Sequence, residues 1–462
     1  MYANKLCLVL GLGETGLAMA QWLTRCGAKL RVADSRALPP GTDDLRRRLP
    51  DAELICGPFE NALLEGVEIV ALSPGLDPRD PLIQAARAQG IPITGEIELF
   101  AAALQQLGWR KDAKVIAITG TNGKTTTTAL VGALCRAAGR ETAVAGNISP
   151  AALAELMRRF DENSRPDIWV LELSSFQLET TRSLNADAAT VLNVTDDHLD
   201  RHGDMDAYAQ TKAAIFVGEG VQVLNADDER VAAMALADRK VVCFSLGAPA
   251  MQDQYGLRKL EGEAWLCKGE AGLLRQTDMQ LAGLHNAANA LAALALCEAI
   301  GLPRAPLIEG LKKFRGLAHR VELVAHREDG VDFYDDSKGT NVGATLAALQ
   351  GLGRKVVLIA GGDGKGQDFR PLTEAFREHA RGVVLIGRDA QRIEAETASS
   401  GVAMWHVADM DAAVLKANSV AEAGDAVMLS PACASLDMYR NYAHRAQVFC
   451  DAVNALPGVR AA

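Results

Sequence analysis

Residues 114–130 read KVIAITGTNGKTTTTAL, and this stretch decides the fold. A short apolar run ends at Gly120, and a threonine-rich helical pattern begins at Lys124, which predicts a strand, a tight loop and a helix. Gly123 lets backbone amides approach an anion, Lys124 adds a positive charge, and Thr125 offers a hydroxyl at the helix start. The sequence therefore predicts a phosphate-binding loop.

The spacing of this loop is shorter than that of the usual phosphate loop. Its pattern is G-x-x-G-K-T, and Ile118 stands where the usual motif has its first glycine. An ordinary strand-to-helix turn would explain the threonines, but it would not explain a lysine directly after Gly123. We therefore interpret the short spacing as the mark of one family of phosphate-binding enzymes.

Other apolar runs along the chain follow the same plan. Each run is short, ends in glycine or a polar cluster and precedes a helical pattern, which predicts parallel sheets covered by helices on both faces. Ligands of such sheets collect at the carboxyl ends of the strands, where the polar clusters fall. The runs are KLCLVLGLGETG (5–16), IWVLELSSFQ (168–177), ATVLNVTDDH (189–198), KVVLIAGGDGKG (355–366), GVVLIGR (382–388) and AVMLSPACAS (426–435).

The length of 462 residues favours about three domains. We expect an α/β protein in which residues 1–95 form a Rossmann-like domain and residues 96–316 form a central domain with a phosphate-loop ATPase-type parallel or mixed sheet. Residues 317–462 are expected to form a second Rossmann-like domain. Within the central part, residues 251–270 have weak hairpin character.

Composition and charge exclude several classes of protein. Hydrophobic residues make up 49% and charged residues 23% of the chain, as in ordinary globular proteins. A net charge of −10 argues against nucleic-acid binding, which needs a basic face. The nine cysteines include no C-x-x-C pair, and the most apolar long stretch carries a histidine, two asparagines and a glutamate. We expect a reduced, cytoplasmic, monomeric protein without membrane insertion.

A glycine-rich pattern near the N-terminus raises a question about its ligand. Gly11, Gly13 and Gly16 have G-x-G-x-x-G spacing, and Asp34 stands where a dinucleotide-binding fold places the carboxylate that holds a ribose. The pattern predicts a loop that opens a helix toward a pyrophosphate, but it does not say which pyrophosphate. A nicotinamide cofactor would fit, but no second nicotinamide feature follows.

Two polar segments follow apolar runs in the central part. Glu172 ends one run, where a carboxylate is costly unless it is paired, bound to a metal or exposed to solvent. Residues 193–202 cluster acidic side chains with His198, which could cap a helix or complete a metal site. Lys212 lies in a helical pattern, where spacing alone favours a solvated charge.

Further candidates lie toward the C-terminus. Asn286 and Asn289 share one helical face, and they could present two amides to a base or cap the helix. Arg320 stands at the second domain boundary, where it could reach a phosphate or lie on the surface. Two Gly-Asp-Lys loops, YDDSKGTN and GGDGKGQDF, fit anion-facing turns or plain turns. We expect Ser435 to be the N-cap of the C-terminal helix, whose N-terminus could also hold a carboxylate.

Taken in this order, the motifs closely resemble those of the Mur ligases, the ATP-dependent enzymes that form amides in peptidoglycan precursor synthesis. GTNGKT, LELSS, NVTDDHLDRH and HNAAN resemble the ATPase domain of the family. DDSKGTNVGAT, GGDGKGQDF and LSPACASLDMYRNY are similar to the last domain of the member that adds D-glutamate, and no D-N-P-R motif of the diamino-acid-adding member occurs. The resemblance covers essentially the whole chain.

The resemblance implies an ATP-dependent ligase that adds D-glutamate to UDP-N-acetylmuramoyl-L-alanine through an acyl phosphate. Its alternatives are another Mur-type or folylpolyglutamate-type amide ligase and, from other classes, an NAD-dependent dehydrogenase or a nucleotide switch. The implied ATP contacts are Gly120, Thr121, Asn122, Gly123, Lys124, Thr125, Thr126, Asn286, Asn289, Arg320 and Asp336.

The resemblance also implies metal and substrate residues. Two Mg²⁺ ions would be held by Thr125, Glu172, His198 and Lys212, with Lys212 carbamylated; Lys124, Glu172, His198 and Lys212 would serve catalysis. The UDP substrate would contact Thr15, Asp34, Ser35, Arg36, Gly75, Asn147 and His198. D-glutamate would be surrounded by Lys338, Thr340, Lys365, Ser435, Leu436 and Tyr442, where the family more often has phenylalanine at the last position.

Overall fold

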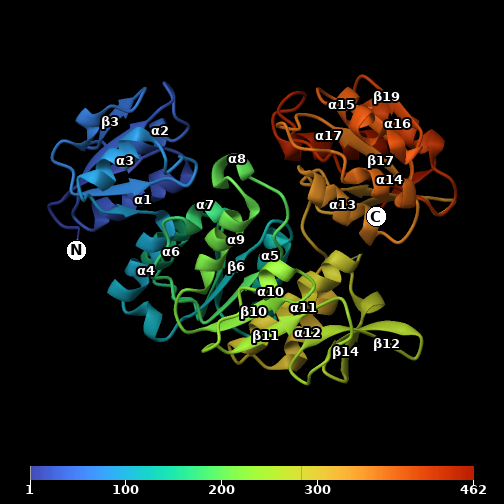
Figure 1. Cartoon of the computed structure of the whole chain (residues 1–462), viewed down its shortest axis with the longest axis horizontal. Helices are drawn as coiled ribbons and strands as arrows, with labels where there is room; N and C mark the ends of the chain where they lie inside the picture. Colours follow the sequence, from blue (N-terminus) through green and yellow to red (C-terminus); the bar gives the residue numbers. More distant parts are fainter. Residues whose placement is uncertain (1, 282) are drawn as a thin grey trace. The chain divides into compact units, whose positions relative to one another are not determined.

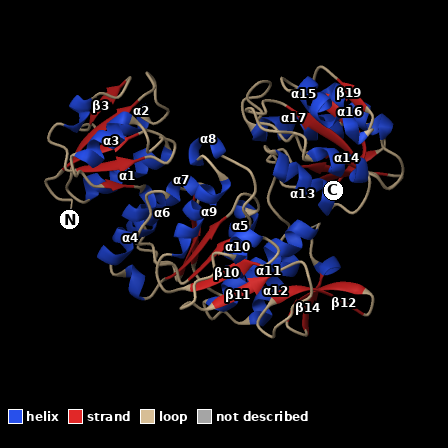
Figure 2. Cartoon of the chain, in the orientation of Figure 1, coloured by secondary structure: helices blue, strands red, loops and turns tan. Residues whose placement is uncertain are grey.

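A computed structural model describes residues 2–281 and 283–462 of the chain. Its strands form three separate sheets, with helices packed on them (Figures 1 and 2). The α/β class expected from the sequence is confirmed. The chain divides into two compact units, of which the first contains Met1–Leu260, Trp265–Leu274 and Ala290–Leu311 and the second contains the remaining segments.

The N-terminal sheet has five strands in the order β3-β2-β1-β4-β5, all parallel. This order places β1 in the middle, so that the glycine loop after β1 opens at the carboxyl edge of the sheet, as in Rossmann-like folds. The elements are β1 (Leu6–Leu10), α1 (Glu14–Arg25), β2 (Lys29–Asp34), α2 (Thr42–Arg48), β3 (Glu53–Cys56), η1 (Asn61–Leu64), β4 (Ile69–Leu72), α3 (Pro81–Ala88) and β5 (Ile93–Thr94).

The central sheet has nine strands in the order β14-β13-β12-β11-β10-β9-β6-β8-β7. The core strands from β7 to β11 pair in parallel, and they consist of apolar, largely buried residues. The strands are β6 (Lys114–Thr119), β7 (Thr142–Gly146), β8 (Ile168–Glu172), β9 (Ala188–Val191), β10 (Val221–Asn225), β11 (Val241–Phe244), β12 (Tyr255–Leu260), β13 (Glu263–Lys268) and β14 (Ala271–Arg275).

The helices of the central part connect these strands. They are α4 (Glu96–Gln106), η2 (Trp109–Lys111), α5 (Lys124–Ala137), α6 (Ala152–Asp161), α7 (Ser175–Leu178), α8 (Leu199–His202), α9 (Met205–Ala213), η3 (Ala214–Phe216), α10 (Glu229–Ala232), η4 (Gln276–Asp278), α11 (Leu284–Ala299) and α12 (Arg304–Lys313). The expected hairpin within residues 251–270 is present as β12 and β13. Its turn residues Glu261 and Gly262 both have positive φ, as a two-residue hairpin turn requires.

The C-terminal sheet has seven strands in the order β19-β18-β17-β20-β16-β15-β21. Strands β19 to β16 are parallel, and β15 and β21 close one edge in antiparallel pairing. The elements are β15 (Glu322–Arg327), β16 (Asp332–Asp335), α13 (Val342–Gly351), β17 (Val356–Gly361), α14 (Leu372–His379), β18 (Ala380–Ile386), α15 (Ala390–Thr397), η5 (Ala398–Ser400), β19 (Met404–His406), α16 (Met410–Val420), β20 (Ala426–Leu429), α17 (Tyr442–Asn454) and β21 (Val459–Ala461).

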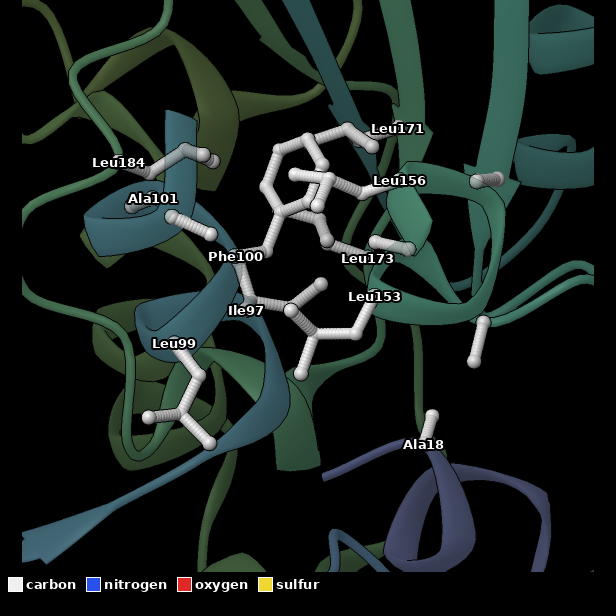
Figure 3. Close-up of a cluster of buried hydrophobic side chains, with 14 of the residues drawn as sticks. Ala18, Ile97, Leu99, Phe100, Ala101, Leu153, Leu156, Leu171, Leu173 and Leu184 are labelled. Atoms are coloured by element: carbon white, nitrogen blue, oxygen red, sulfur yellow. The ribbon is translucent and has the colours of Figure 1, made fainter. Parts of the chain in front are cut away.

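One apolar cluster runs from the first sheet into the central sheet. Figure 3 shows the α4 side chain Phe100 facing Leu156 of α6 and Leu171 of β8, and Ala18 of α1 at the margin of the same cluster. Phe100 also meets Trp169 edge to face, with ring centroids 4.9 Å apart. This shared core explains why the first two sheets belong to one compact unit.

The prediction that Ser435 caps the C-terminal helix is wrong. Helix α17 begins at Tyr442, and its N-cap is Asn441, whose side chain accepts a hydrogen bond of 2.8 Å from the backbone N–H of His444. Ser435 lies six residues earlier, before a turn in which its carbonyl accepts from Tyr439. Among the residues described, no helix is long and apolar enough to cross a membrane.

Candidate active site

The loop between β6 and α5 has the backbone of an anion cradle. Gly120 has φ +152°, and a Cβ there would lie 3.0 Å from the Cβ of Leu192. Gly123 has φ +81° and is the N-cap of α5. Only glycine fits the first position without a shift of the neighbouring loop, and the second position favours glycine for its left-handed conformation. The amide N–H groups at the start of α5 therefore face the loop, as the sequence predicts.

The cradle is held in shape by the loop that follows β9. The backbone N–H groups of Thr121 and Asn122 donate to the main-chain and side-chain oxygens of Asn193, at 2.9 and 2.8 Å. Asn193 donates back to the carbonyl of Asn122 at 3.1 Å, and Thr195 donates its N–H to the hydroxyl of Thr121 at 3.0 Å. The sequence placed Asn193 in an acidic cluster, but its role is to brace the loop.

Two lysines converge on one carbonyl oxygen of this loop. The Nζ atoms of Lys124 and Lys212 donate to the carbonyl of Gly120 at 2.8 and 2.9 Å. Lys212 is 1% exposed, and its Nζ lies 4.3 Å from the centre of the Tyr208 ring. Burial, and then the charge of Lys124, hold the pKa of Lys212 well below its usual value. The solvated charge favoured by spacing is therefore wrong for Lys212.

Glu172 ends β8 beside the phosphate loop, since it pairs with Ile118 of β6 on one side and with Gly146 of β7 on the other. Its side chain is 1% exposed. Oε1 accepts from the side chain of Asn147 at 2.7 Å, whereas Oε2 is buried and has no hydrogen-bond partner among the residues described. A buried carboxylate oxygen without a partner is expensive, and a bound cation would remove the cost.

His198 lies at the start of α8, with φ +56°. Its ring meets Phe176 edge to face at 4.8 Å, and its Nε2 lies 3.6 Å from Asp197. The neighbouring His202 is buried against Phe176, and burial followed by the charge of Arg201 lowers its pKa to about 4. Among the residues that the structure describes, no hydrogen bond joins His198 to Glu172.

The N-terminal glycine loop shows a different use of Asp34 from that in dinucleotide-binding folds. Its Oδ2 accepts from the N–H of Leu12 and from Arg36, both at 2.7 Å, and its Oδ1 accepts from the N–H and Nε of Arg36. The Arg36 guanidinium holds the pKa of Asp34 at about 2. Asp34 therefore fixes the glycine loop and orients the Arg36 side chain. Both of its carboxylate oxygens already accept hydrogen bonds from the protein. A Cβ at Gly16 would lie 1.8 Å from the carbonyl of Gly11.

Three loops of the C-terminal sheet meet at the carboxyl ends of β16, β20 and β17, which are neighbours. Gln367 joins them, because its side chain accepts from Val342 and donates to the carbonyl of Ala432 at 2.7 Å. These loops carry Lys338, Thr340, Lys365, Ser435 and Leu436, and the first residue of α17 is Tyr442. The Nζ of Lys338 lies 3.8 Å from the centre of the Tyr442 ring.

Arg445 was not singled out from the sequence. An arginine among apolar residues of a predicted helix can indicate a buried, hydrogen-bonded side chain, and this pattern could have identified it. Arg445 is 1% exposed and donates to Ser337 Oγ at 3.0 Å, to the Ser337 carbonyl at 2.8 Å and to the Cys433 carbonyl at 3.1 Å. Burial lowers its pKa to about 10. Arg445 thus ties the loop of Lys338 to the loop of Ser435.

Three nucleotide candidates are largely buried. Asn286 and Asn289 lie in α11 at 5% and 7% exposure, with 3.3 Å between the Asn289 amide and the Asn286 oxygen. Asp336 accepts from Ser430 at 2.6 Å, and burial raises its pKa to about 7 despite the nearby charge of Arg320. These residues belong to the second compact unit.

The remaining candidate residues differ in how far their side chains are exposed to solvent. Thr126 is buried, Thr15, Thr125 and Thr340 are half-buried, and Ser35, Gly75, Asn147 and Lys365 are exposed. One further cluster of metal-ligating types lies among the residues described, formed by His319, Glu322 and Asp335. Its His319 Nδ1 lies 2.6 Å from an Asp335 oxygen. A hydrogen bond explains this contact without a metal.

Three family descriptions match successive parts of the chain. Residues 5–95 match the "Mur ligase MurD-like, N-terminal domain", residues 118–297 the "Mur ligase middle domain", and residues 319–433 the "Mur ligase, glutamate ligase domain". Two relatives named "UDP-N-acetylmuramoylalanine--D-glutamate ligase" match over nearly their full length. The protein of Aromatoleum aromaticum is 61% identical over 99% of both chains, and that of Nitrosomonas europaea is 52% identical over 98% of this chain and 97% of its own.

Solved structures agree on the fold. The UDP-N-acetylmuramate-alanine ligase of Thermotoga maritima superimposes with a TM-score of 0.57 over 97% of this chain and 98% of its own, at 21% identity. The MurF structure of Acinetobacter baumannii gives a TM-score of 0.61 over 98% of this chain and 91% of its own, at 16% identity. At such identities the likeness concerns the three-sheet architecture alone.

Proposed function

The chain belongs to the Mur ligase family, and from this premise we propose that it adds D-glutamate to UDP-N-acetylmuramoyl-L-alanine in peptidoglycan synthesis. ATP drives the reaction. The observation that carries this function is the pairing of a phosphate loop with a buried, half-partnered Glu172 in a chain similar over its full length to D-glutamate ligases. The N-terminal glycine pattern then serves the UDP group, and the nicotinamide alternative is set aside.

The phosphate loop is suited to ATP and the residues around it to Mg²⁺. Residues 120–126 would hold the phosphates of ATP, and the further nucleotide contacts that we propose are Asn286, Asn289, Arg320 and Asp336. The orphaned Oε2 of Glu172 supports a cation there, with Thr125, His198 and Lys212 as further ligands. Bound Mg²⁺ would screen the negative charges of ATP and carboxylate, which must meet before a phosphoryl group can transfer.

Lys212 is proposed to act as a carbamate. Its buried position and lowered pKa favour the neutral amine, which is the form that adds to CO₂ with loss of a proton. The product carries a carboxylate-type oxygen on a long side chain. Such an oxygen can bind Mg²⁺, whereas an ammonium group cannot.

The two substrates would occupy loops of different sheets. The UDP group would lie against the glycine loop, with Thr15, Asp34, Ser35, Arg36 and Gly75, while Asn147 and His198 would lie nearer the reacting carboxylate. D-glutamate would lie among the three C-terminal loops, where Lys338 and Lys365 match its two carboxylates. Thr340, Ser435, Leu436 and Tyr442 would complete that subsite.

The chemistry follows from these positions. ATP converts the L-alanine carboxylate into an acyl phosphate, because a free carboxylate is a poor electrophile. The D-glutamate amine then attacks the carbonyl carbon, the C–O bond to phosphate breaks, and the amine loses a proton. The products are an amide, ADP and phosphate. We further propose that residues 1–95, 96–316 and 317–462 act as three functional domains of a cytoplasmic monomer.

An ADP-release assay tests the function. Purified protein, ATP, Mg²⁺ and UDP-N-acetylmuramoyl-L-alanine are combined with D-glutamate, L-glutamate, L-alanine or L-lysine in turn. We expect ADP release to need D-glutamate. Equal rates with the other amino acids would point to another amide ligase, and ADP release without any amine would point to a nucleotide switch.

A further inference from the structure

Glu14 stands at the junction of two loops that the proposed function assigns to one substrate. It is the first residue of α1, directly after the N-terminal glycine loop. Its Oε1 accepts from the Ser149 hydroxyl at 2.9 Å and from the Ala151 N–H at 3.0 Å. Ser149 and Ala151 belong to the loop between β7 and α6, so this carboxylate joins the first sheet to the central one.

Helix α6 depends on this contact for its first turn. Its N-cap residue is Ala151, which has no side-chain oxygen to cap the helix. The N–H of Ala151 is taken by Glu14, and the N–H of Leu153 donates to Glu96 of α4 at 2.7 Å. Carboxylates from two other helices therefore supply the cap, at the helix end where negative charge is favoured.

The same loop continues to the candidate metal ligand. Asn147 donates its backbone N–H to the Glu172 carbonyl at 2.8 Å and its side-chain amide to Glu172 Oε1 at 2.7 Å. The loop is tight, because Gly146 donates its N–H to the carbonyl of Pro150 at 3.0 Å. A short series of hydrogen bonds thus runs from Glu14 through residues 147–151 to Glu172.

The far ends of the same two helices are joined by a second contact. Arg25, the last residue of α1, pairs with Asp161, the last residue of α6, through bonds of 2.7 and 2.5 Å. Ala18 of α1 and Leu153 of α6 belong to one apolar cluster (Figure 3). Helices α1 and α6 are therefore fixed at both ends, and only the Glu14 end faces the substrate loops.

We propose that Glu14 is a positioning residue that couples binding of the UDP group to placement of the reacting carboxylate beside Glu172. The inference rests on the proposed function, in which one substrate spans both loops. Binding energy at a remote group raises turnover only when that group and the reacting group are held at a fixed separation. Glu14 fixes the separation of the glycine loop from the loop of Asn147.

The kinetic test compares Glu14→Ala, Glu14→Gln and Arg25→Ala with the unaltered protein. Each is assayed with UDP-N-acetylmuramoyl-L-alanine and with N-acetylmuramoyl-L-alanine, which lacks the UDP group. Glu14→Ala should lower kcat for the full substrate roughly 10- to 100-fold and leave the KM of ATP and the slow rate with the truncated substrate unchanged. Glu14→Gln keeps an acceptor oxygen and should keep most of the rate. Arg25→Ala, the matched control, should resemble the unaltered protein.

Three kinetic results would overturn the inference. A rise of the KM for the UDP substrate without loss of kcat would make Glu14 a simple binding residue. An equal loss with both substrates, or an equal loss in Arg25→Ala, would assign the effect to helix packing. Circular dichroism melting of each variant shows whether the fold is kept.

A second measurement does not depend on ligation. UDP alone is added, and hydrogen exchange is followed at the amides of residues 147–149 and of Ala151. UDP should slow exchange there in the unaltered protein and in Glu14→Gln but not in Glu14→Ala. Equal protection in Glu14→Ala would refute the coupling, whereas a failure of the proposed function would appear separately, as absence of D-glutamate-dependent ADP release in the unaltered protein.

Discussion

The phosphate loop and the C-terminal three-loop site occupy equivalent places, at the carboxyl ends of parallel strands, but they carry their charges differently. In the central sheet Lys212 and Glu172 are each 1% exposed and are held by backbone or amide groups. In the C-terminal sheet Lys365 is exposed and Lys338 rests on the face of Tyr442, while the buried Arg445 donates to one hydroxyl and two carbonyl oxygens.

This difference separates two kinds of site. Buried ionisable groups cost free energy unless a ligand completes them, so the central site is organised for ions that enter it. The exposed Lys365 keeps its hydration and costs little, so this part of the C-terminal site can remain open to solvent until an amino acid arrives. Substitutions should therefore abolish chemistry in the central site and weaken binding in the C-terminal one.

The first prediction concerns Lys212, and it has the largest expected effect. Lys212→Ala should lower turnover roughly 1,000-fold or more, because loss of a metal-binding carbamate removes several kcal/mol of charge stabilisation. Steady-state ADP release with bicarbonate present measures the loss. In the C-terminal site Lys338→Ala should instead raise the KM of D-glutamate while ATP binding is kept.

Two controls accompany this prediction. Lys212→Met retains the side-chain volume and should keep the fold while it lacks activity. Lys114→Ala removes a half-exposed lysine on β6 that pairs with Asp187 at 3.0 Å, and its activity should be normal. Near-normal turnover of Lys212→Ala would refute the carbamate proposal and the contrast drawn between the two sites.

The contrast also explains what could be predicted from the sequence. The phosphate loop could be predicted because Gly120, Gly123 and Lys124 lie close together in the sequence and form a motif. The short apolar runs likewise predicted the strands of all three sheets. Arg445 acts on Ser337, 108 residues earlier, and Asn193 on Asn122, 71 residues earlier. Pairings of that kind depend on how loops meet across a sheet, which no local pattern records.

The error at Ser435 has a similar cause. Ser435 and Asn441 both have the chemistry of an N-cap. The segment before Ser435 is held extended, because Ala434 and Asp363 exchange backbone hydrogen bonds and a Cβ at Gly362 would lie 2.3 Å from the Ala434 carbonyl. The helix therefore starts only after the chain has left this pairing.

The second prediction concerns pH and compares the two compact units. Burial raises the pKa of Asp336 in the second unit and of Glu96 in the first unit to about 7. The folded state then binds more protons than the unfolded state between about pH 4 and pH 7, so stability falls as pH rises through this window. The raised pKa values correspond to roughly 3 to 4 kcal/mol per group.

Urea unfolding between pH 4.5 and 7.5, followed by hydrogen exchange in each unit, measures this effect. Asp336→Asn should flatten the pH dependence of the second unit only, because an amide still accepts from Ser430 but does not titrate. Glu96→Gln should flatten that of the first unit only. An unchanged slope in either variant would mean that the buried carboxyl does not control the pH dependence of its unit.

The third prediction has the smallest effect and separates structure from binding within the C-terminal site. Asn441→Ala should destabilise the second unit by about 1 kcal/mol, because α17 loses its N-cap. Ser435→Ala should leave stability nearly unchanged, since the Ser435 hydroxyl makes no hydrogen bond to the other residues described. It should raise the KM of D-glutamate roughly fivefold through one lost hydrogen bond. Urea unfolding and D-glutamate kinetics of both variants measure the two effects. The reverse result, in which Ser435→Ala is unstable and Asn441→Ala is impaired in binding, would contradict the prediction. It would mean that Ser435 stabilises the helix and that Asn441 contributes to D-glutamate binding.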